Sequence, residues 1–411
     1  MNVDTMRAID RNFGIPLTFV LTLWKWLVEK IVPQRPVRPR KILFIELSEM
    51  GSTILVDPAL RKVKEHLDGE LFFVIFQKNR ASLDLIGTIR PENTFTIRET
   101  GLLVLVNDTL RFLQWARRQQ IDTVVDLELF SRFTALLSGL CGAVNRVGFY
   151  NFHNEGLYRG ELLTHKVSYN CHIHIAKNFI ALVNSLITDT PELPYSKEII
   201  SDSEITLPTV SFREQELENM CTLVGKYYPG YVRNQHRIVL INPNASELLP
   251  QRRWMAKRYV ELIQRILEAA PDVIILITGA PSEQEEADEK CGLVGSERCI
   301  NFAGALKLEQ LPMLYTIATL MVTNDSGPGH FSSITLLPTF VLFGPETPAL
   351  YGSLGNSTPI FAGLACSPCV SAANHRKTPC IDNKCLQAIT VKQVFETIWP
   401  VLSKKREESG M

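Results

Sequence analysis

Short apolar runs alternate with helical patterns along most of the chain. In the first half, the runs of strand length are 41–47, 71–76, 94–97 and 123–127. The first of them, KILFIEL, is apolar and bounded by polar residues, which is typical of a strand buried on both faces of a parallel sheet. A helical pattern at 58–66 follows it. Strands that alternate with helices predict βαβ units in a right-handed parallel sheet.

The second half repeats this pattern. Its predicted strands are 237–241, 273–278, 320–323 and 339–342. Helices are predicted at 256–269 and, in a stretch of small residues, at 331–336. The polar, proline-containing stretch 183–212 is predicted to be a linker. We therefore expect two doubly wound α/β domains whose sheets face a cleft, because open parallel sheets bind ligands at the carboxyl ends of their strands.

Residues 13–32 (FGIPLTFVLTLWKWLVEKIV) form an apolar segment, and a proline-rich, basic stretch follows it. A membrane-spanning helix needs about 20 consecutive apolar residues, and Lys25 and Glu29 interrupt this segment. We predict instead a helix at a membrane surface, with Trp24 and Trp26 at the level of the lipid headgroups. The alternative is a helix that packs on the protein's own body.

Composition narrows the classes of function. The 411 residues suffice for two domains, and 45% hydrophobic with 21% charged residues is typical of a globular protein. The 43 basic and 43 acidic residues leave no net charge, which argues against a dedicated nucleic-acid binder. Nine cysteines, an odd number, without a secretory signature indicate a reducing compartment rather than a disulfide framework.

Candidate chemistry follows the predicted strands of the first half. The turn after the first strand presents backbone amides that open a helix and suit an anion. The strand at 123–127 runs into Asp126-Leu127-Glu128, and strand alternation places both carboxylates on one side. These two carboxylates either line the ligand-binding cleft or have structural roles, as the cap of a helix and as a partner in a surface ion pair. The acceptor or phosphate contacts predicted in this half are Ser48, Gly51, Ser52 and Arg132.

The second half offers an anion site. Arg252 and Arg253 precede a predicted helix, where the helix dipole favours acids, so this pair favours a bound anion such as a pyrophosphate. Glu283 follows a strand and suits a ribose or base contact. The loop 324–330 (NDSGPGH) combines acceptors, free amides and glycines, which suit a diphosphate. The contacts predicted in this loop are Asp325, Ser326, Gly327 and His330.

Four cysteines lie close together near the end of the sequence. They are Cys366, Cys369, Cys380 and Cys385. Four sulfurs suit a zinc site, but the second pair lacks the C-x-x-C spacing of the first. We therefore assign no metal and interpret them as a structural cluster.

Taken together, the motifs resemble glycosyltransferase family 9, the ADP-heptose:lipopolysaccharide heptosyltransferases and their relatives. The resemblance runs from about Lys41 to the end of the chain. Its strongest motifs are NDSGPGH at 324–330, LFGPETP at 342–348 and KILFIELSEMGSTILVDPAL at 41–60, supported by RRW at 252–254 and GAPSE at 279–283. Arg252 stands where the family has a lysine near the donor phosphates, Glu283 matches the acid that holds the nucleoside, and the 324–330 loop matches the donor-phosphate loop.

The resemblance implies a GT-B fold and an inverting sugar transfer without metal or cofactor. The donor is a nucleotide-diphosphate sugar, ADP-linked by default, and the acceptor is a lipopolysaccharide or other glycolipid or polysaccharide precursor. It also implies a cytoplasmic protein, peripheral on the inner face of the cytoplasmic membrane. We expect a membrane-surface segment at 1–40, an acceptor domain at 41–205, a nucleotide-sugar domain at 206–400 and a charged tail at 401–411.

One residue departs from the family pattern. The family's early turn usually ends in Gly-Asp, and that aspartate is the expected general base, whereas this chain has Ser52. A serine hydroxyl does not replace a carboxylate as a base near neutral pH without an activating partner. Glu49 in the same turn is our first replacement, Glu128 the second and Asp57 the third. The alternatives are a catalytically silent sugar-nucleotide-binding scaffold and a nucleotide-sugar epimerase or hydrolase on the same fold.

Overall fold

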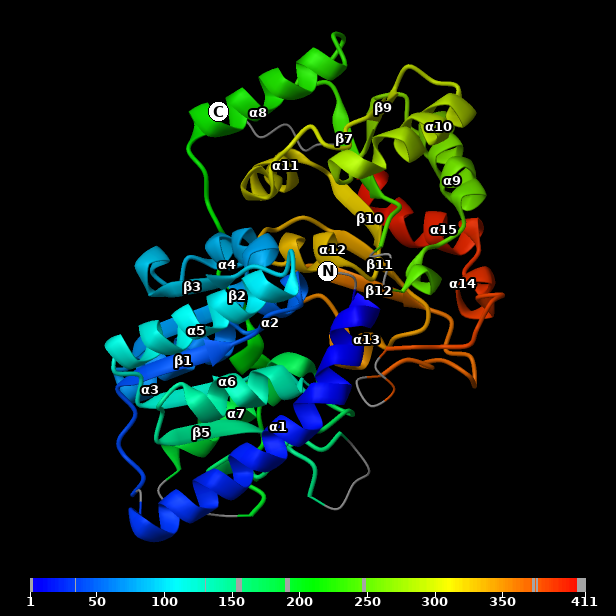
Figure 1. Ribbon diagram of the computed structural model, residues 1–411. Helices are drawn as coiled ribbons and strands as arrows, with labels where there is room; N and C mark the ends of the chain where they lie inside the picture. Colours follow the sequence, from blue (N-terminus) through cyan, green and yellow to red (C-terminus); the bar gives the residue numbers. More distant parts are fainter. Residues whose placement is uncertain are drawn as a thin grey trace. The chain divides into compact units, whose positions relative to one another are not determined.

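The chain divides into two compact units, each built around one parallel sheet (Figure 1). The first unit is Met1–Thr206 with Ala372–His375, and the second is Leu207–Ser371 with Arg376–Met411. This computed structural model describes residues 3–33, 35–129, 131–152, 157–188, 193–245, 249–371, 374 and 376–404. Residues 405–411 of the predicted tail lie outside the described residues.

The sheet of the first unit has six strands in the described residues, in the order β3-β2-β1-β4-β5-β6. The strands are β1 (Lys41–Ile45), β2 (Glu70–Phe76), β3 (Thr94–Ile97), β4 (Thr123–Asp126), β5 (Asn145–Tyr150) and β6 (His165–Ser168). The helices are α1 (Val3–Ile31), α2 (Met50–Leu55), α3 (Asp57–Leu67), α4 (Arg80–Ile86), α5 (Leu102–Arg118), α6 (Arg132–Leu140) and α7 (Ile175–Ile187). The strand order reverses between β1 and β4, which is the topological switch point where such sheets bind ligands.

The second unit repeats this order, with six described strands arranged β12-β11-β10-β7-β8-β9. The strands are β7 (Arg237–Asn242), β8 (Val273–Ile277), β9 (Cys299–Asn301), β10 (Leu320–Asn324), β11 (Thr339–Phe343) and β12 (Ser357–Phe361). The helices are α8 (Glu214–Tyr227), α9 (Ala256–Ala269), α10 (Gln284–Val294), α11 (Leu311–Ile317), α12 (Gly327–Ser332), α13 (Pro348–Tyr351), α14 (Lys384–Ala388) and α15 (Val391–Leu402). The switch point here lies between β7 and β10.

The cores explain why the central strands were predictable. Strand β1 pairs in parallel with both β2 and β4, and its four residues from Ile42 to Ile45 have no solvent exposure. In the first unit, Phe112 of α5 and Leu137 of α6 pack onto the same apolar cluster as Val124 of β4. Strands covered on both faces must be apolar at consecutive positions. Each strand predicted from an apolar run is confirmed.

The sequence pattern did not predict four of the strands: β5, β6, β9 and β12. Strand β6 (HKVS) and strand β12 (STPIF) are edge strands with polar or proline residues, and β9 is an edge strand of only three residues. Edge strands need no continuous apolar run. Strand β5 (NRVGFY) is buried but begins with Asn145 and Arg146, whose side chains hydrogen-bond inside the unit. No apolar run therefore marked it.

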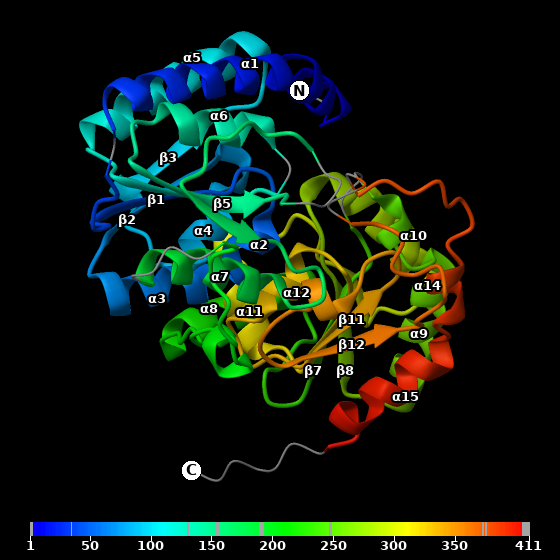
Figure 2. The same ribbon diagram turned by 90° about the horizontal axis from the view of Figure 1, so that it is seen from below.

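Two further expectations are corrected. The helix predicted at 331–336 is α12, which begins at Gly327 and ends at Ser332. The linker predicted at 183–212 is wrong at its start, because residues up to Ile187 belong to α7 and are largely buried. Residues 13–31 of the apolar segment lie in a longer helix, α1, which packs on α6 of its own unit (Figure 2). The position of this helix at a membrane surface stays a prediction. No helix in the described part of the chain is both long enough and apolar enough to cross a membrane.

Candidate functional site

The ends of β1 and β4 meet at the switch point of the first unit. The register pairs Ile45 with Asp126, so the residues that follow each strand come together. Oε1 of Glu128, beyond β4, accepts hydrogen bonds from three donors of the turn beyond β1. They are the backbone N–H groups of Leu47 at 3.1 Å and Ser48 at 3.2 Å, and the Ser48 hydroxyl at 2.8 Å. Glu128 therefore holds the β1–α2 turn in place.

The same turn carries a second carboxylate. Ser52, nearly buried in α2, donates a hydrogen bond from Oγ to Oε2 of Glu49 at 2.9 Å. The backbone N–H of Glu49 donates to Oε1 of Glu46 at 3.3 Å. Glu46 is a buried acid at the end of the first apolar run, and sequence reasoning did not single it out. Its place directly after a strand was the available signal.

Burial and like charge shape the protonation of this cluster. Loss of hydration raises the pKa of Glu128, and the nearby negative charge of Glu49 raises it further. Burial also raises the pKa of Asp126, and the positive charge of Arg159 opposes that shift. Asp126 accepts from Thr134 Oγ1 at 3.1 Å and forms an ion pair with Arg159. Strand β4 ends at Asp126, so the predicted alternation does not extend to Glu128, and the two side chains bind different partners.

Two predicted residues are bound elsewhere in the unit. Arg132 is buried, and its guanidinium donates to the Tyr158 carbonyl at 2.7 Å and to Asp10 of α1 at 3.1 Å. Asp57 lies at the start of α3, as expected, but it pairs with Arg61 at 3.0 Å and accepts from the Thr88 hydroxyl. The structure therefore groups Ser48, Glu49, Ser52 and Glu128, with Gly51 in the first turn of α2.

At the switch point of the second unit, Asn324 joins three elements. Its Nδ2 donates to the Pro243 carbonyl at 2.7 Å, in the loop after β7. Its Oδ1 accepts from the backbone N–H of Trp254 and from the Tyr259 hydroxyl, both at 3.0 Å. Because Asn324 is fully buried at the end of β10, these bonds fix the loop that carries the arginines. Sequence reasoning included Asn324 in a motif without giving it this role.

The two adjacent arginines have different partners. A guanidinium nitrogen of Arg252 lies 3.7 Å from Oδ2 of Asp325. Nε of Arg252 is buried and has no hydrogen-bond partner among the described residues. Arg253 instead donates to the Ala245 carbonyl at 2.9 and 3.1 Å. Of these two arginines, Arg252 is the one that contacts the Asp325 loop. The anion expected between the arginine pair and the helix that follows it stays a prediction.

The other donor-side candidates are largely bound within their own loops. Oε2 of Glu283 accepts from the backbone N–H of Ala280 at 2.6 Å and so caps its own turn. Ser326 donates to the Asn324 carbonyl at 3.1 Å, and His330 is buried in α12. At Gly327, an added Cβ would lie 3.1 Å from the Phe331 ring, which is a packing reason for glycine. Contacts of these donor-side candidates with a nucleotide-sugar donor stay predictions.

None of the nine cysteines forms a disulfide bond, and Cys366, Cys369, Cys380 and Cys385 are among them. Among the described residues, no group of three or more histidine, cysteine or acidic side chains is arranged to hold a metal ion.

The family follows from comparison. The model of glycosyltransferase family 9 (heptosyltransferase) matches residues 109–378, more than half of the chain. The chain belongs to glycosyltransferase family 9. The resemblance drawn from the motifs is thereby confirmed, and the matched range includes Glu128, Arg252 and the 324–330 loop.

Curated heptosyltransferases are similar over parts of their length. Lipopolysaccharide heptosyltransferase 2 of Salmonella typhimurium is 31% identical over 106 residues, which are 25% of this chain and 30% of that protein. Lipooligosaccharide heptosyltransferase 2 of Campylobacter jejuni is 26% identical over 175 residues, 41% of this chain and 53% of that protein. The chain thus spans about a third to half the length of these two relatives.

Solved structures of family 9 proteins share the fold. The ADP-heptose lipopolysaccharide heptosyltransferase II of E. coli superposes with a TM-score of 0.67 at 19% identity, covering 88% of this chain and 98% of that one. The family 9 glycosyltransferase of Veillonella parvula gives a TM-score of 0.66 at 18% identity, covering 90% and 99%. This family 9 chain, with its two parallel-sheet units, therefore has the GT-B fold that the motifs implied.

Proposed function

We propose that this protein is an inverting glycosyltransferase. It moves a heptose-like sugar from a nucleotide-diphosphate donor, ADP-linked, to a lipopolysaccharide or related glycolipid or polysaccharide precursor. Residues 41–205 bind the acceptor, residues 206–400 bind the donor, and the protein works on the inner face of the cytoplasmic membrane. Family membership supports the class of reaction. The observation that carries the proposal is the carboxylate of Glu49 in the turn where the family's base is expected, with the carboxylate of Glu128 hydrogen-bonded to the same turn.

In this mechanism Glu49 is the general base. It removes the proton of the acceptor hydroxyl as that oxygen attacks the anomeric carbon, opposite the bond to the leaving diphosphate. One carbon–oxygen bond forms and one breaks, so the configuration inverts. The Ser52 hydroxyl, hydrogen-bonded to Glu49, orients this carboxylate. Glu128 is a positioning residue, because its Oε1 is occupied by the three donors of the turn.

Arg252 stabilises the leaving group. Its buried Nε lacks a hydrogen-bond partner among the described residues, and a diphosphate oxygen would supply one. Asp325 lies 3.7 Å away and holds the guanidinium in the loop that matches the family's donor-phosphate motif. A guanidinium positioned beside the diphosphate stabilises the negative charge that develops as this group leaves. It lowers the activation free energy of the transfer without a metal ion.

A transfer assay with ADP-heptose and a lipopolysaccharide-precursor acceptor tests the proposal. For Glu49→Gln we expect kcat to fall about 100-fold or more, within the range of general-base catalysis, while calorimetry shows unchanged ADP binding. Glu65→Gln is the matched control, because Glu65 is an exposed acid on α3 of the same unit. Unchanged kcat in Glu49→Gln would contradict the assignment of Glu49.

A second candidate function is a silent sugar-nucleotide-binding scaffold, which Ser52 favours because a hydroxyl replaces the expected carboxylate. The same assay separates the two. Donor binding without transfer by the wild type would support the scaffold. Release of ADP without transfer would instead indicate a hydrolase.

A further inference from the structure

Helix α1 is amphipathic, but it turns its polar side toward the protein and its apolar side toward solvent, unlike an ordinary surface helix. Its polar side chains face the protein: Asp10 forms an ion pair with Arg132, and Glu29 forms one with Arg146, each at 3.1 Å. Between them, the Thr22 hydroxyl accepts from the backbone N–H of Glu161 at 3.0 Å. Surface helices normally bury their apolar stripe and expose their polar one. Here the inward stripe is largely polar.

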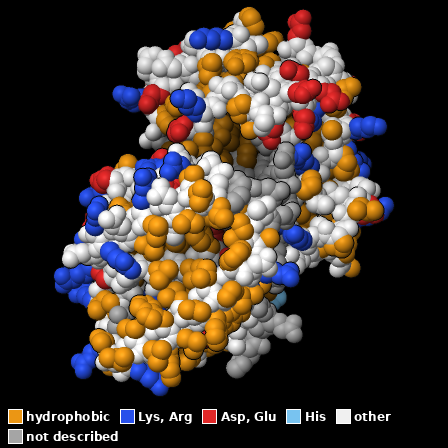
Figure 3. Space-filling view, viewed as in Figure 1, with side chains coloured by type: hydrophobic (Ala, Val, Ile, Leu, Met, Phe, Trp, Pro, Cys, Tyr) orange, Lys and Arg blue, Asp and Glu red, His pale blue; other side chains and the backbone are white. Residues whose placement is uncertain are grey.

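The outward face of α1 is apolar. Ten large apolar side chains on it are exposed by 41 to 80%: Phe13, Ile15, Leu17, Phe19, Val20, Leu23, Trp24, Trp26, Leu27 and Ile31. Figure 3 shows apolar side chains gathered over this region, with Lys and Arg at its edges. An exposed apolar patch of this extent is uncommon on a monomeric soluble protein and marks an interaction surface.

Helix α5 continues the apolar surface. Both α1 and α5 contact α6, and they lie over the same side of the first sheet (Figures 1 and 2). The exposed apolar residues of α5 are Leu102, Leu103, Val106 and Leu110. We call the outward residues of α1 and these four residues of α5 the apolar face.

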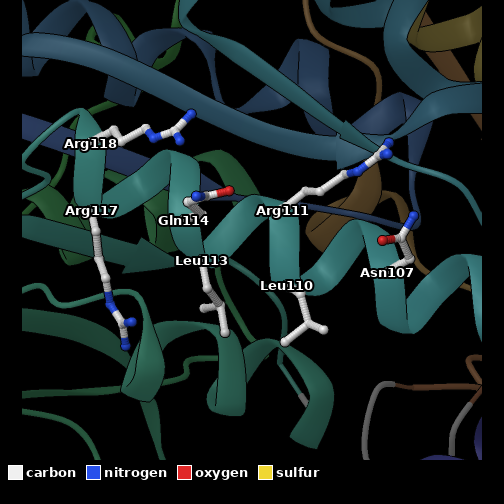
Figure 4. A pocket seen from close by; sticks show the side chains of 7 residues that line it. All are labelled: Asn107, Leu110, Arg111, Leu113, Gln114, Arg117 and Arg118. Carbon is white, nitrogen blue, oxygen red and sulfur yellow. The ribbon is translucent and has the colours of Figure 1, made fainter.

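The charges around the apolar face are basic. The charged residues exposed on the described parts of α1, α5 and the stretch after α1 are Arg11, Lys30, Arg35, Arg38, Arg40, Arg111, Arg117 and Arg118. Nζ of Lys30 lies 3.7 Å from the centre of the Trp26 ring, an arrangement suited to the interface between lipid and water. A hollow of about 690 Å³ beside α5 is lined by Leu110 and Leu113 together with Arg111, Arg117 and Arg118 (Figure 4). Such a lining suits an anionic lipid headgroup and the start of its chains.

The ion pairs fix the orientation of α1. Asp10 and Glu29 are 19 residues apart, so these attachments span about 28 Å of helix at 1.5 Å per residue. A helix attached along its length in this way presents its side, and not its end, to a partner.

We propose that the apolar face binds an anionic lipid bilayer, with α1 lying in the plane of the membrane and its basic rim against the headgroups. Apolar side chains enter the acyl boundary while Trp24 and Trp26 lie at the headgroup level. This inference deepens the proposed function, on which it rests, since a glycolipid acceptor is itself held in that bilayer.

Vesicle co-sedimentation of the full-length protein tests the inference. Vesicles of phosphatidylcholine with about 30% phosphatidylglycerol are compared with phosphatidylcholine alone. We expect the wild type to bind the anionic vesicles at least about tenfold more tightly, and Leu23→Glu to lose about tenfold or more of that binding. Ile199→Glu is the matched control, because Ile199 is 97% exposed in the same unit but outside the apolar face. We expect it to bind like the wild type.

A second readout uses the wild type itself. Brominated lipid should quench the fluorescence of Trp24 and Trp26, and their replacement by Phe should remove that quenching. Equal binding by Leu23→Glu and the wild type would overturn the proposal. A second outcome would also overturn it: the wild type does not bind vesicles but forms a dimer, and Leu23→Glu dissociates that dimer. The apolar face would then be a contact between two copies of the chain. Transfer to a delipidated, soluble acceptor should be unaffected by Leu23→Glu, so failure here is distinguishable from failure of the proposed function.

Discussion

Ser52 donates a hydrogen bond to Glu49 across one turn of chain, with 2.9 Å between Oγ and Oε2. By the resemblance of the early turn, the serine stands where family 9 usually has its catalytic aspartate, and its hydroxyl is bound to a carboxylate three residues earlier. The departure from the family pattern and the base that we propose in its place are therefore in direct contact.

The contact between Ser52 and Glu49 predicts that a carboxylate introduced at position 52 restores the activity lost when Glu49 is replaced. Glu49→Gln should lower kcat about 100-fold, and adding Ser52→Asp should restore about tenfold or more, because a carboxylate returns to the turn. Ser52→Asn in the same background is the control, since it has a similar shape without the charge. Steady-state transfer assays measure all three variants. Equal activity of the aspartate and asparagine double variants would contradict a base in this turn.

The raised pKa of Glu128 predicts a pH-dependent stability. Because the folded state disfavours the ionised carboxyl, its stability contribution is full below the unfolded value of about 4.3 and is lost as pH rises through the higher folded pKa. Glu128→Gln removes this titration and retains an acceptor for the turn. The free energy of unfolding of Glu128→Gln relative to the wild type should therefore increase from about pH 4 to about pH 8. Urea unfolding at both pH values checks this, and a constant difference would refute it.

The buried pair of Asp126 and Arg159 predicts a non-additive double-mutant cycle. Arg159→Met leaves a buried carboxylate without its counter-charge and should cost about 3 kcal/mol of unfolding free energy at neutral pH. Adding Asp126→Asn should recover about half of that loss, because no charge then remains. Denaturant titration of the four proteins measures the coupling. Additive losses would show that the pair contributes independently.

Asn324 predicts a local stability effect in the second unit. Asn324→Ala leaves the Trp254 N–H and the Pro243 carbonyl without their partner and should cost about 2 to 4 kcal/mol. Tyr259→Phe removes one of the same hydrogen bonds and should cost about 1 kcal/mol. Thermal and urea unfolding of the two variants compare these costs. Similar losses in both would mean that Asn324 does not hold the loop.

The two arginines predict a selective loss of donor affinity. Arg252→Gln should weaken ADP binding about tenfold or more, whereas Arg252→Lys should lose less, since the charge remains although the Nε donor is gone. Arg253→Gln is the matched control, because Arg253 binds the Ala245 carbonyl instead. Calorimetric titration gives the dissociation constants. A greater loss in Arg253→Gln would reverse the assignment.

Local sequence was sufficient for the strands that lie inside the sheets, except β5. Runs such as 41–47 and 273–278 are apolar because both faces of each strand are covered, so the pattern and the burial have the same cause. The motifs identified the family for a similar reason, since turns after strands need particular residues at fixed spacing. Glu49 and Glu128 were both named from their positions after strands.

The sequence by itself determined the two α/β halves, the family and the residue types available at the strand ends. Only the tertiary structure decided which of them meet. The parallel register of β1 and β4 brings Glu128 to the turn at Ser48, although 80 residues separate them. The docking of α1 engages Arg132 through Asp10 and turns the apolar side of α1 outward. These outcomes depend on contacts between distant segments, and local periodicity carries no information about such pairings.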